Sequence, residues 1–245
     1  GAFKSCHPCI FRITHAAVEP VGGLYPLVST FAQLVAKRFI YHSELEEVPS
    51  NEGNVTAGAA GGSAQPRQHA RYDTATELVH CYTEIKTLYY TSALHEQVYV
   101  LMHEALSRAE VQCPFEIPVM QFAAVGVAMS LGGGGKEGVW ILERAIPGKF
   151  HKYINNNSLA PNPRLTAPYL HIAIFLTFCQ HMQYMFTDKR CLITDYQGSQ
   201  TILTDAQIST RREDSEYFSS GNITNLLDDF DSVHVCNEWC DYFGI

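Results

Sequence analysis

The sequence lacks two features that would assign it to a broad class of protein. No apolar run reaches the ~18–20 residues of a membrane-spanning helix, because polar side chains interrupt the most apolar stretch at His171, Gln180, His181 and Gln183. Lysines and arginines are scattered without forming a basic stripe, and the net charge is −8. Since binding to nucleic acid requires a basic face, we expect neither a nucleic acid partner nor insertion into a membrane.

A secretory pattern is also missing. No signal-peptide pattern is present at the N-terminus, and the eight cysteines are not spaced as in small disulfide-rich proteins. We therefore expect reduced cysteines and an intracellular, cytoplasmic protein. The 245 residues, 46% of them hydrophobic, suffice for one large domain or two lobes.

The first half of the chain contains strand, loop and helix patterns in turn. Residues 1–48 are predicted to contain strands, the clearest at 31–41, where β-forming residues dominate. Residues 49–73 are rich in Gly, Ala and Ser and predict a flexible loop. Between Thr74 and Cys113 there is no Gly or Pro, and apolar residues recur every three or four positions. This predicts one long amphipathic helix or a pair of helices.

The second half alternates apolar strands with one apolar helix. Residues 115–129 and 139–143 are predicted strands, and residues 169–186 are a predicted helix that follows Pro168. A short apolar strand then ends at Asp195.

Two carboxylates and a carboxamide follow short apolar steps. Asp195, Gln197 and Asp205 lie on neighbouring predicted turns, and their oxygens suit a hard cation such as Mg²⁺, which commonly bridges carboxylates to nucleotide phosphates. The alternative is that both aspartates cap turns. Lys37 lies in the predicted strand 31–41, either as a surface lysine whose stem packs along apolar neighbours or as a contact for phosphate.

Near the C-terminus, His234, Cys236 and Cys240 place one imidazole and two thiols close together in sequence. Such ligands suit tetrahedral Zn²⁺, and a structural site needs a fourth. His181, on the predicted apolar helix, is the best candidate, although a lone histidine on such a helix is otherwise a satisfied core residue.

Two further motifs are less specific. Cys6 and Cys9 form a C-x-x-C pair, a metal or redox hypothesis, but no second half with matching spacing follows. The glycine run 132–135 before Lys136 does not match a Walker motif, because Ser130 occupies the first glycine position and Glu137 follows the lysine.

Taken in order, several segments resemble those of one family. They are Gly1–Lys4, the strand around Lys37, Leu142–Glu143 with Gly148–Asn157, Phe178–His181, Asp195–Gly198, Leu203–Ile208 and His234–Cys240. The chain resembles the catalytic domain of the alpha-kinases, which are atypical protein kinases. The resemblance covers nearly the whole chain, and its last three segments are the most specific.

The resemblance implies an α+β, two-lobed, protein-kinase-like fold with a structural zinc in the C-lobe. We expect a single domain over residues 1–245, with an N-lobe of about 1–142 and a C-lobe of about 143–245. The implied function is a Ser/Thr protein kinase that transfers the γ-phosphoryl group of Mg-ATP to a hydroxyl of a protein substrate.

The resemblance also implies roles for single residues in the nucleotide cleft. Lys37 would hold the α and β phosphates, and Glu143 would mark the hinge beside the adenine. Lys4 stands where the family has an arginine in its N-lobe loop. Glu84 would be the partner of the strand lysine.

In the C-lobe, Asp195 would be the catalytic aspartate. Gln197 and Asp205 would engage Mg²⁺ and the phosphates. Four residues would bind Zn²⁺: His181, His234, Cys236 and Cys240.

One departure supports an alternative function. The family's C-lobe glycine-rich loop runs Gly-x-x-Asn-Leu-Gly, whereas residues 221–227 here end in Leu227. In addition, residues Gly1–Lys4 correspond only to the last part of the family's N-lobe loop. The alternative is a weakly active or inactive pseudokinase that acts as a zinc-stabilised nucleotide-binding or protein-binding domain.

Overall fold

The computed structural model describes residues 3–9, 33–42, 69–130, 137–218 and 224–245. The elements in these ranges are β1 (Phe3–Cys9), β2 (Leu34–His42), β3 (His69–Ala70), α2 (Thr74–Arg108), β4 (Gln121–Phe122), β5 (Val125–Met129), β6 (Val139–Arg144), β7 (His151–Lys152), α3 (Tyr169–Phe186), β8 (Cys191–Thr194), β9 (Gln197–Gly198), β10 (Ile202–Thr204), β11 (Gln207–Thr210), η2 (Arg212–Tyr217), α4 (Thr224–Asp228), α5 (Phe230–Val233) and α6 (Glu238–Phe243). Most of the predicted loop 49–73 lies outside the described residues, as do the glycine run 132–135 and the start of the segment 221–227.

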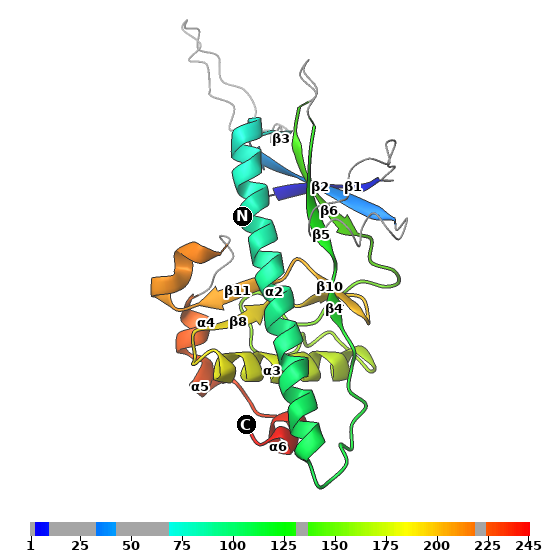
Figure 1. The fold of residues 1–245 in the computed structure, drawn as a ribbon, viewed down its shortest axis with the longest axis vertical. Coiled ribbons are helices and arrows are strands. Elements are labelled where there is room, and N and C mark those ends of the chain that lie inside the picture. The colour runs from blue at the N-terminus through cyan, green and yellow to red at the C-terminus, as the bar shows by residue number, and fades with distance from the viewer. Residues whose placement is uncertain (1–2, 10–32, 43–68, 131–136, 219–223) are drawn as a thin grey trace, which may run out of the picture.

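The described N-terminal strands form one antiparallel sheet in the order β1-β2-β6-β5, with β3 paired to β2 (Figure 1). Lys4 of β1 lies opposite Phe39, and Cys6 lies opposite Lys37. Because side chains alternate between the two faces of a strand, Lys4 and Lys37 are on the same face of this sheet. This register, which the sequence pattern does not determine, brings the two lysines together.

The second half of the chain forms a lower layer of short strands on helix α3 (Figure 1). Its described strands pair in the order β4-β10-β9-β7, and β11 pairs with β8 in a separate two-stranded antiparallel sheet. At Gly198, which has φ +150°, an added Cβ would come within 2.1 Å of the Ile202 carbonyl oxygen. The tight β9–β10 connection therefore requires glycine.

Helix α2 runs along both layers, from the upper sheet down to α3 and α6 (Figure 1). The Asp73 carboxylate caps its start by accepting from the backbone N–H groups of Ala75 and Thr76, as expected of an N-cap. Its buried residue Cys81 packs against the upper sheet, and its buried residues Val98 and Met102 belong to the core of the lower layer. The helix therefore fixes one layer relative to the other.

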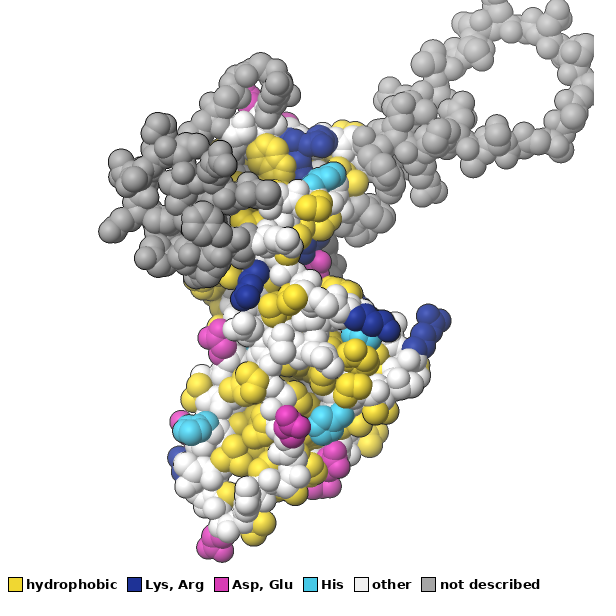
Figure 2. All heavy atoms as spheres, turned by 90° about the vertical axis from the view of Figure 1, so that its right-hand side faces the viewer, with side chains coloured by type: hydrophobic (Ala, Val, Ile, Leu, Met, Phe, Trp, Pro, Cys, Tyr) yellow, Lys and Arg dark blue, Asp and Glu magenta, His cyan; other side chains and the backbone are white. Residues whose placement is uncertain are grey.

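The main core lies around α3, whose Phe175, Phe178 and Cys179 are fully buried together with Trp239 of α6. On the face shown in Figure 2, the described Lys and Arg side chains do not form one continuous patch, and hydrophobic side chains occupy much of the lower half. None of the described helices has the length and hydropathy needed to span a membrane.

Several element predictions are confirmed. Helix 169–186 has the predicted bounds, a single helix fills most of 74–113, and β6 covers 139–144. The predicted strand at 115–129 is instead two strands that belong to different sheets, since β4 pairs with β10 and β5 pairs with β6.

Candidate active site

Asp195 and Asp205 each follow a short strand and have a left-handed backbone, with φ of +62° and +48°. Few residues other than glycine adopt this conformation, although Asp does so more readily than most. The side-chain amide of Gln197 lies between the two turns. It donates to Asp195 Oδ2 over 3.2 Å and to the Asp205 carbonyl oxygen over 3.1 Å. The three residues predicted from the sequence as one polar cluster therefore come together.

Lys37 extends from β2 to one carboxylate of β6 and one carboxylate of the turn after β10. Its Nζ forms an ion pair with the carboxylate of Glu143 and lies 2.9 Å from Asp205 Oδ1. Glu143 is 2% exposed and also accepts a hydrogen bond from the Thr204 hydroxyl. The amine is therefore buried and paired, unlike a solvated surface lysine.

Lys4 reaches the same carboxylate from the neighbouring strand. Its Nζ lies 2.5 Å from Glu84 Oε1 and 3.2 Å from Asp205 Oδ1. Asp205 Oδ1 thus accepts from the two ammonium groups of Lys4 and Lys37. Residues from β1, β2, α2, β6 and the turn after β10 meet in one ionic cluster.

The charges of this cluster reinforce one another. Burial acts to lower the pKa of Lys37 and Lys4, but the carboxylates of Glu143, Asp205 and Glu84 outweigh it, so both lysine pKa values lie above their ordinary 10.5. Burial acts to raise the pKa of Asp205, but the two ammonium groups outweigh it and hold that pKa below its ordinary 3.8. All three groups are therefore ionised at neutral pH.

The partner predicted for Lys37 needs correction. Glu84 pairs with Lys4, and Lys37 pairs with Glu143 and Asp205. The physical reason is the position of Glu84 on α2, which faces β1 at the level of Lys4. The carboxylate of Glu143 lies within the ionic cluster, while its backbone is paired in the sheet with Val35 and Val125.

Lys152, which the sequence reasoning did not single out, forms an ion pair with Asp195. It lies on β7, which pairs with β9 so that Lys152 is opposite Gln197. Its place in the segment Gly148–Asn157, one of those that carry the family resemblance, was a usable signal. Thr204, next to Asp205, was also missed.

A second cluster lies at the base of the lower layer. His181 of α3, His234, Cys236 and Cys240 each offer one ligand atom, and these atoms all lie within 4.8 Å of one another. Cys236 Sγ is 3.8 Å from His181 Nδ1, and Cys240 Sγ is 3.8 Å from His234 Nε2. His181, left open in the sequence analysis, belongs to this group.

The donor atoms of this cluster fit a zinc ion in chemistry and number. Burial lowers the pKa of His181, and burial together with the charge of His181 lowers that of His234 to about 4, so both imidazoles are neutral at pH 7 and can act as ligands. Burial raises the pKa of Cys240 to about 11. Without a cation, that thiol would stay protonated, whereas a bound metal favours the thiolate.

Cys6 and Cys9 are both free thiols of β1. Being three positions apart on a strand, they point to opposite faces. Among the described residues the only His/Cys/Asp/Glu group that could hold a metal is the one at His181, so these residues form no metal site around the C-x-x-C pair.

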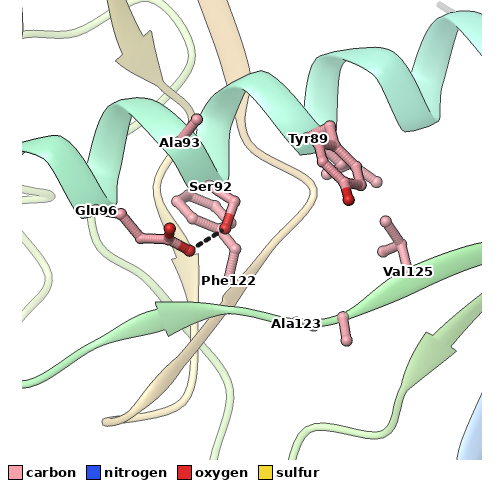
Figure 3. A pocket seen from close by; sticks show the side chains of 9 residues that line it. Tyr89, Ser92, Ala93, Glu96, Phe122, Ala123 and Val125 are labelled. Atoms are coloured by element: carbon pink, nitrogen blue, oxygen red, sulfur yellow. Dashed lines mark hydrogen bonds between the residues drawn. The ribbon is translucent and has the colours of Figure 1, made fainter. Parts of the chain in front are cut away.

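A cavity of about 360 Å³ lies apart from both clusters, between α2 and the β4–β5 segment. Tyr89, Ser92 and Glu96 of α2 line it opposite Phe122 and Val125, and Ser92 donates to Glu96 over 2.9 Å (Figure 3). None of the candidate nucleotide, catalytic or zinc residues lines this cavity.

Comparison with known sequences gives one family. The sequence model of the alpha-kinase family matches residues 29–240. Alpha-protein kinase 3 of Mus musculus is 36% identical over 66 residues, which are 27% of this chain and 4% of that protein. Alpha-protein kinase 2 of Danio rerio is 35% identical over 66 residues, which are 27% of this chain and 3% of that protein. The matched part is thus a small fraction of these curated relatives.

Comparison with solved structures gives similar folds at low identity. The alpha-kinase domain of myosin heavy chain kinase A in complex with AMP matches over 100% of this chain and 91% of that one, with a TM-score of 0.52 and 15% identity. The same domain in complex with AMPPCP matches over 87% and 64%, with a TM-score of 0.52 and 17% identity. The C-terminally truncated domain of myosin heavy chain kinase matches over 87% and 65%, also with 0.52 and 17%.

Proposed function

The chain belongs to the alpha-kinase family and has its α+β, kinase-like fold, and we propose that it is an ATP-dependent protein kinase that phosphorylates serine or threonine. The observation that carries this proposal is the ionic cluster in which Lys37 and Lys4 meet Asp205, with Asp195 beside it. Phosphoryl transfer needs mainly positioning and charge stabilisation, and these residues supply both.

Binding of the nucleotide would use the cations of the upper sheet. Lys37 and Lys4 project from the same sheet face towards Asp205, so a phosphate group between them would meet two ammonium groups at once. The solved relative bound to AMPPCP has the same fold, which supports the proposal that an adenine nucleotide binds in this cleft. Glu143, which pairs with Lys37, would hold that amine in place.

Transfer to the acceptor would use Asp195. Its carboxylate, oriented by Lys152 and Gln197, would accept the proton of a serine or threonine hydroxyl or orient that hydroxyl. The oxygens of Asp205 and Gln197 are hard ligands that suit Mg²⁺. Bound there, Mg²⁺ would neutralise phosphate charge.

Zinc would have a structural role. We propose that His181, His234, Cys236 and Cys240 bind Zn²⁺ and tie α3 to the C-terminal segment, because these atoms converge around one point. The fully buried Cys240 and Trp239 beside them belong to the main core, so the metal would stabilise the lower layer as a whole. The proposed lobes are residues 1–142 and 143–245, with α2 packed against both layers.

The alternative remains a pseudokinase that binds nucleotide or protein without transfer. The ending of residues 221–227 in Leu227 favours it. It predicts nucleotide binding without labelled product, whereas the kinase proposal predicts both.

The test is transfer from γ-labelled Mg-ATP to a generic basic protein, followed by identification of the labelled amino acid. Asp195→Ala should abolish transfer while the protein stays folded. Asp188→Ala is a matched control, since Asp188 is an exposed aspartate with φ +54° outside the cleft. Equal turnover of Asp195→Ala and wild type would reject the role of Asp195, and phosphotyrosine as the only product would reject the proposed acceptor.

A further inference from the structure

Lys37 lies where the ladder between β2 and β6 ends. The pairing runs from Leu34 opposite Arg144 to Lys37 opposite Ile141. Beyond Lys37, the described residues of β2 pair with β1 and β3. The backbone pairing of β2 with β6 therefore stops directly after the candidate phosphate-binding lysine.

The next side chain, Arg38, replaces the missing backbone pairing. Its guanidinium donates to both oxygens of Glu77 on α2, over 2.5 Å and 2.9 Å. The same Glu77 carboxylate accepts from the backbone N–H of Val139 in β6 over 3.1 Å. Arg38 also donates to the Glu137 carbonyl oxygen over 3.0 Å. A buried side-chain bridge thus joins β2, β6 and α2 at the point where the ladder stops.

The fold is shaped to admit this bridge. Glu77 is fully buried and Arg38 is 9% exposed, so both groups have left water and depend on each other. A Cβ on Gly138 would lie 2.4–2.9 Å from three atoms of the Arg38 guanidinium. Glycine at position 138 therefore leaves the space that the guanidinium fills, while the other side of that group stacks over Trp140 with 4.9 Å to the ring centroid.

We propose that Arg38, acting through Glu77 in the space left by Gly138, is a positioning residue that holds Lys37 at the phosphate-binding site. Lys37 and Arg38 are consecutive residues of β2, so a bridge that fixes Arg38 to α2 and β6 also restrains the backbone that carries the Lys37 amine. The inference rests on the proposed function of Lys37 as a nucleotide contact. It also assigns α2 a role in setting the cleft, because Glu77 is part of that helix.

The test uses a double variant, Arg38→Met/Glu77→Gln. It buries no lone charge, which would otherwise threaten folding, and the glutamine oxygen can still accept from Val139 N–H. Gly138→Ala is a second variant, since it displaces the guanidinium without removing any charge. The matched control is Arg190→Met/Asp214→Asn, which removes another bidentate pair of an arginine with a carboxylate. That pair joins the residue before β8 to η2, away from the cleft.

Two readouts are measured well below the melting temperature of each variant. The first is the acetylation rate of the Lys37 amine by an N-hydroxysuccinimide ester, followed by peptide mass spectrometry with exposed Lys189 as the internal reference. The second is the KM for ATP. We expect Lys37 acetylation and the KM each to rise about tenfold, because the amine would no longer be held in its paired position, while the control matches wild type.

A purely structural bridge would lower the melting temperature and the active fraction, leaving both the KM and the Lys37 acetylation rate unchanged. That result would overturn the inference, as would loss of folding in both variants. Because acetylation needs no nucleotide, it separates the two proposals. If wild type transfers no phosphate and Lys37 still becomes more reactive in the variants, the proposed function fails and the positioning role stands.

Discussion

Replacing Lys37 by methionine should destabilise the protein even without nucleotide. The change removes the ammonium group that pairs with Glu143 and Asp205. The Glu143 side chain is 3% exposed and would keep only the Thr204 hydroxyl as a partner. Asp205 would keep Lys4, and its side chain is 33% exposed, so most of the loss would arise at Glu143.

The magnitude follows from that burial. Removing one partner of a buried ion pair costs about 3–5 kcal/mol. Because Glu143 keeps one hydrogen bond, we expect about 3 kcal/mol for Lys37→Met, which lowers the melting temperature by about 6–12 °C in a chain of this size. The double variant Lys37→Met/Glu143→Gln removes the unpaired charge and should recover about 2 kcal/mol of that loss.

The assay is urea denaturation followed by circular dichroism, with the slope m compared among wild type, both single variants and the double variant. An unchanged slope with a lower midpoint would show a change in stability alone. A Lys37→Met protein within about 0.5 kcal/mol of wild type would refute the buried pair, and so would a double variant no more stable than Lys37→Met.

Three further predictions concern the metal, the pH dependence and helix α2. Cys236→Ala should lose bound zinc and unfold at a lower temperature, because structural zinc contributes several kcal/mol to folding, and up to ~10–16 kcal/mol in finger peptides. Cys113→Ala, outside the cluster, is the control. Equal zinc content in the two variants would contradict the site. The depressed pKa of Asp205 contributes stability that is fully present above its ordinary 3.8 and is lost as the pH falls through its lower folded value. Acid titration of unfolding should therefore be shallower below pH 3.8 in Asp205→Asn than in wild type, and parallel curves would contradict the pairing. Asp73→Ala should cost about 1 kcal/mol through loss of the α2 N-cap, as measured by thermal unfolding, and no loss would mean that the cap is redundant.

Local elements were predictable because their signals are local. The largely apolar segment after Pro168 yields α3 with the predicted bounds, and the absence of Gly and Pro after Thr74 yields the single long helix α2. Asp195, Gln197 and Asp205 could be grouped because the turns that carry them are close in sequence.

The pairing of charges could not be predicted in the same way. Lys4 and Glu84 are 80 residues apart, and they meet only because of the β1–β2 register and the rotation of α2 about its axis. Nothing in the sequence around Glu84 distinguishes Lys4 from Lys37 as its partner. His181 is similar: an imidazole on an apolar helix becomes a ligand candidate only when the C-terminal segment folds back to it.

The central claim is that nucleotide phosphates bind between the lysines of the upper sheet and Asp205. Calorimetric titration of wild type, Lys37→Met and Lys189→Met with Mg-ATP tests it most directly, because Lys189 is an exposed lysine of the lower layer. The account predicts binding by wild type and Lys189→Met, with affinity at least about tenfold weaker for Lys37→Met, since charge-assisted contacts contribute about 1.5–3 kcal/mol. Equal affinities in all three proteins, or no binding to wild type, would contradict it.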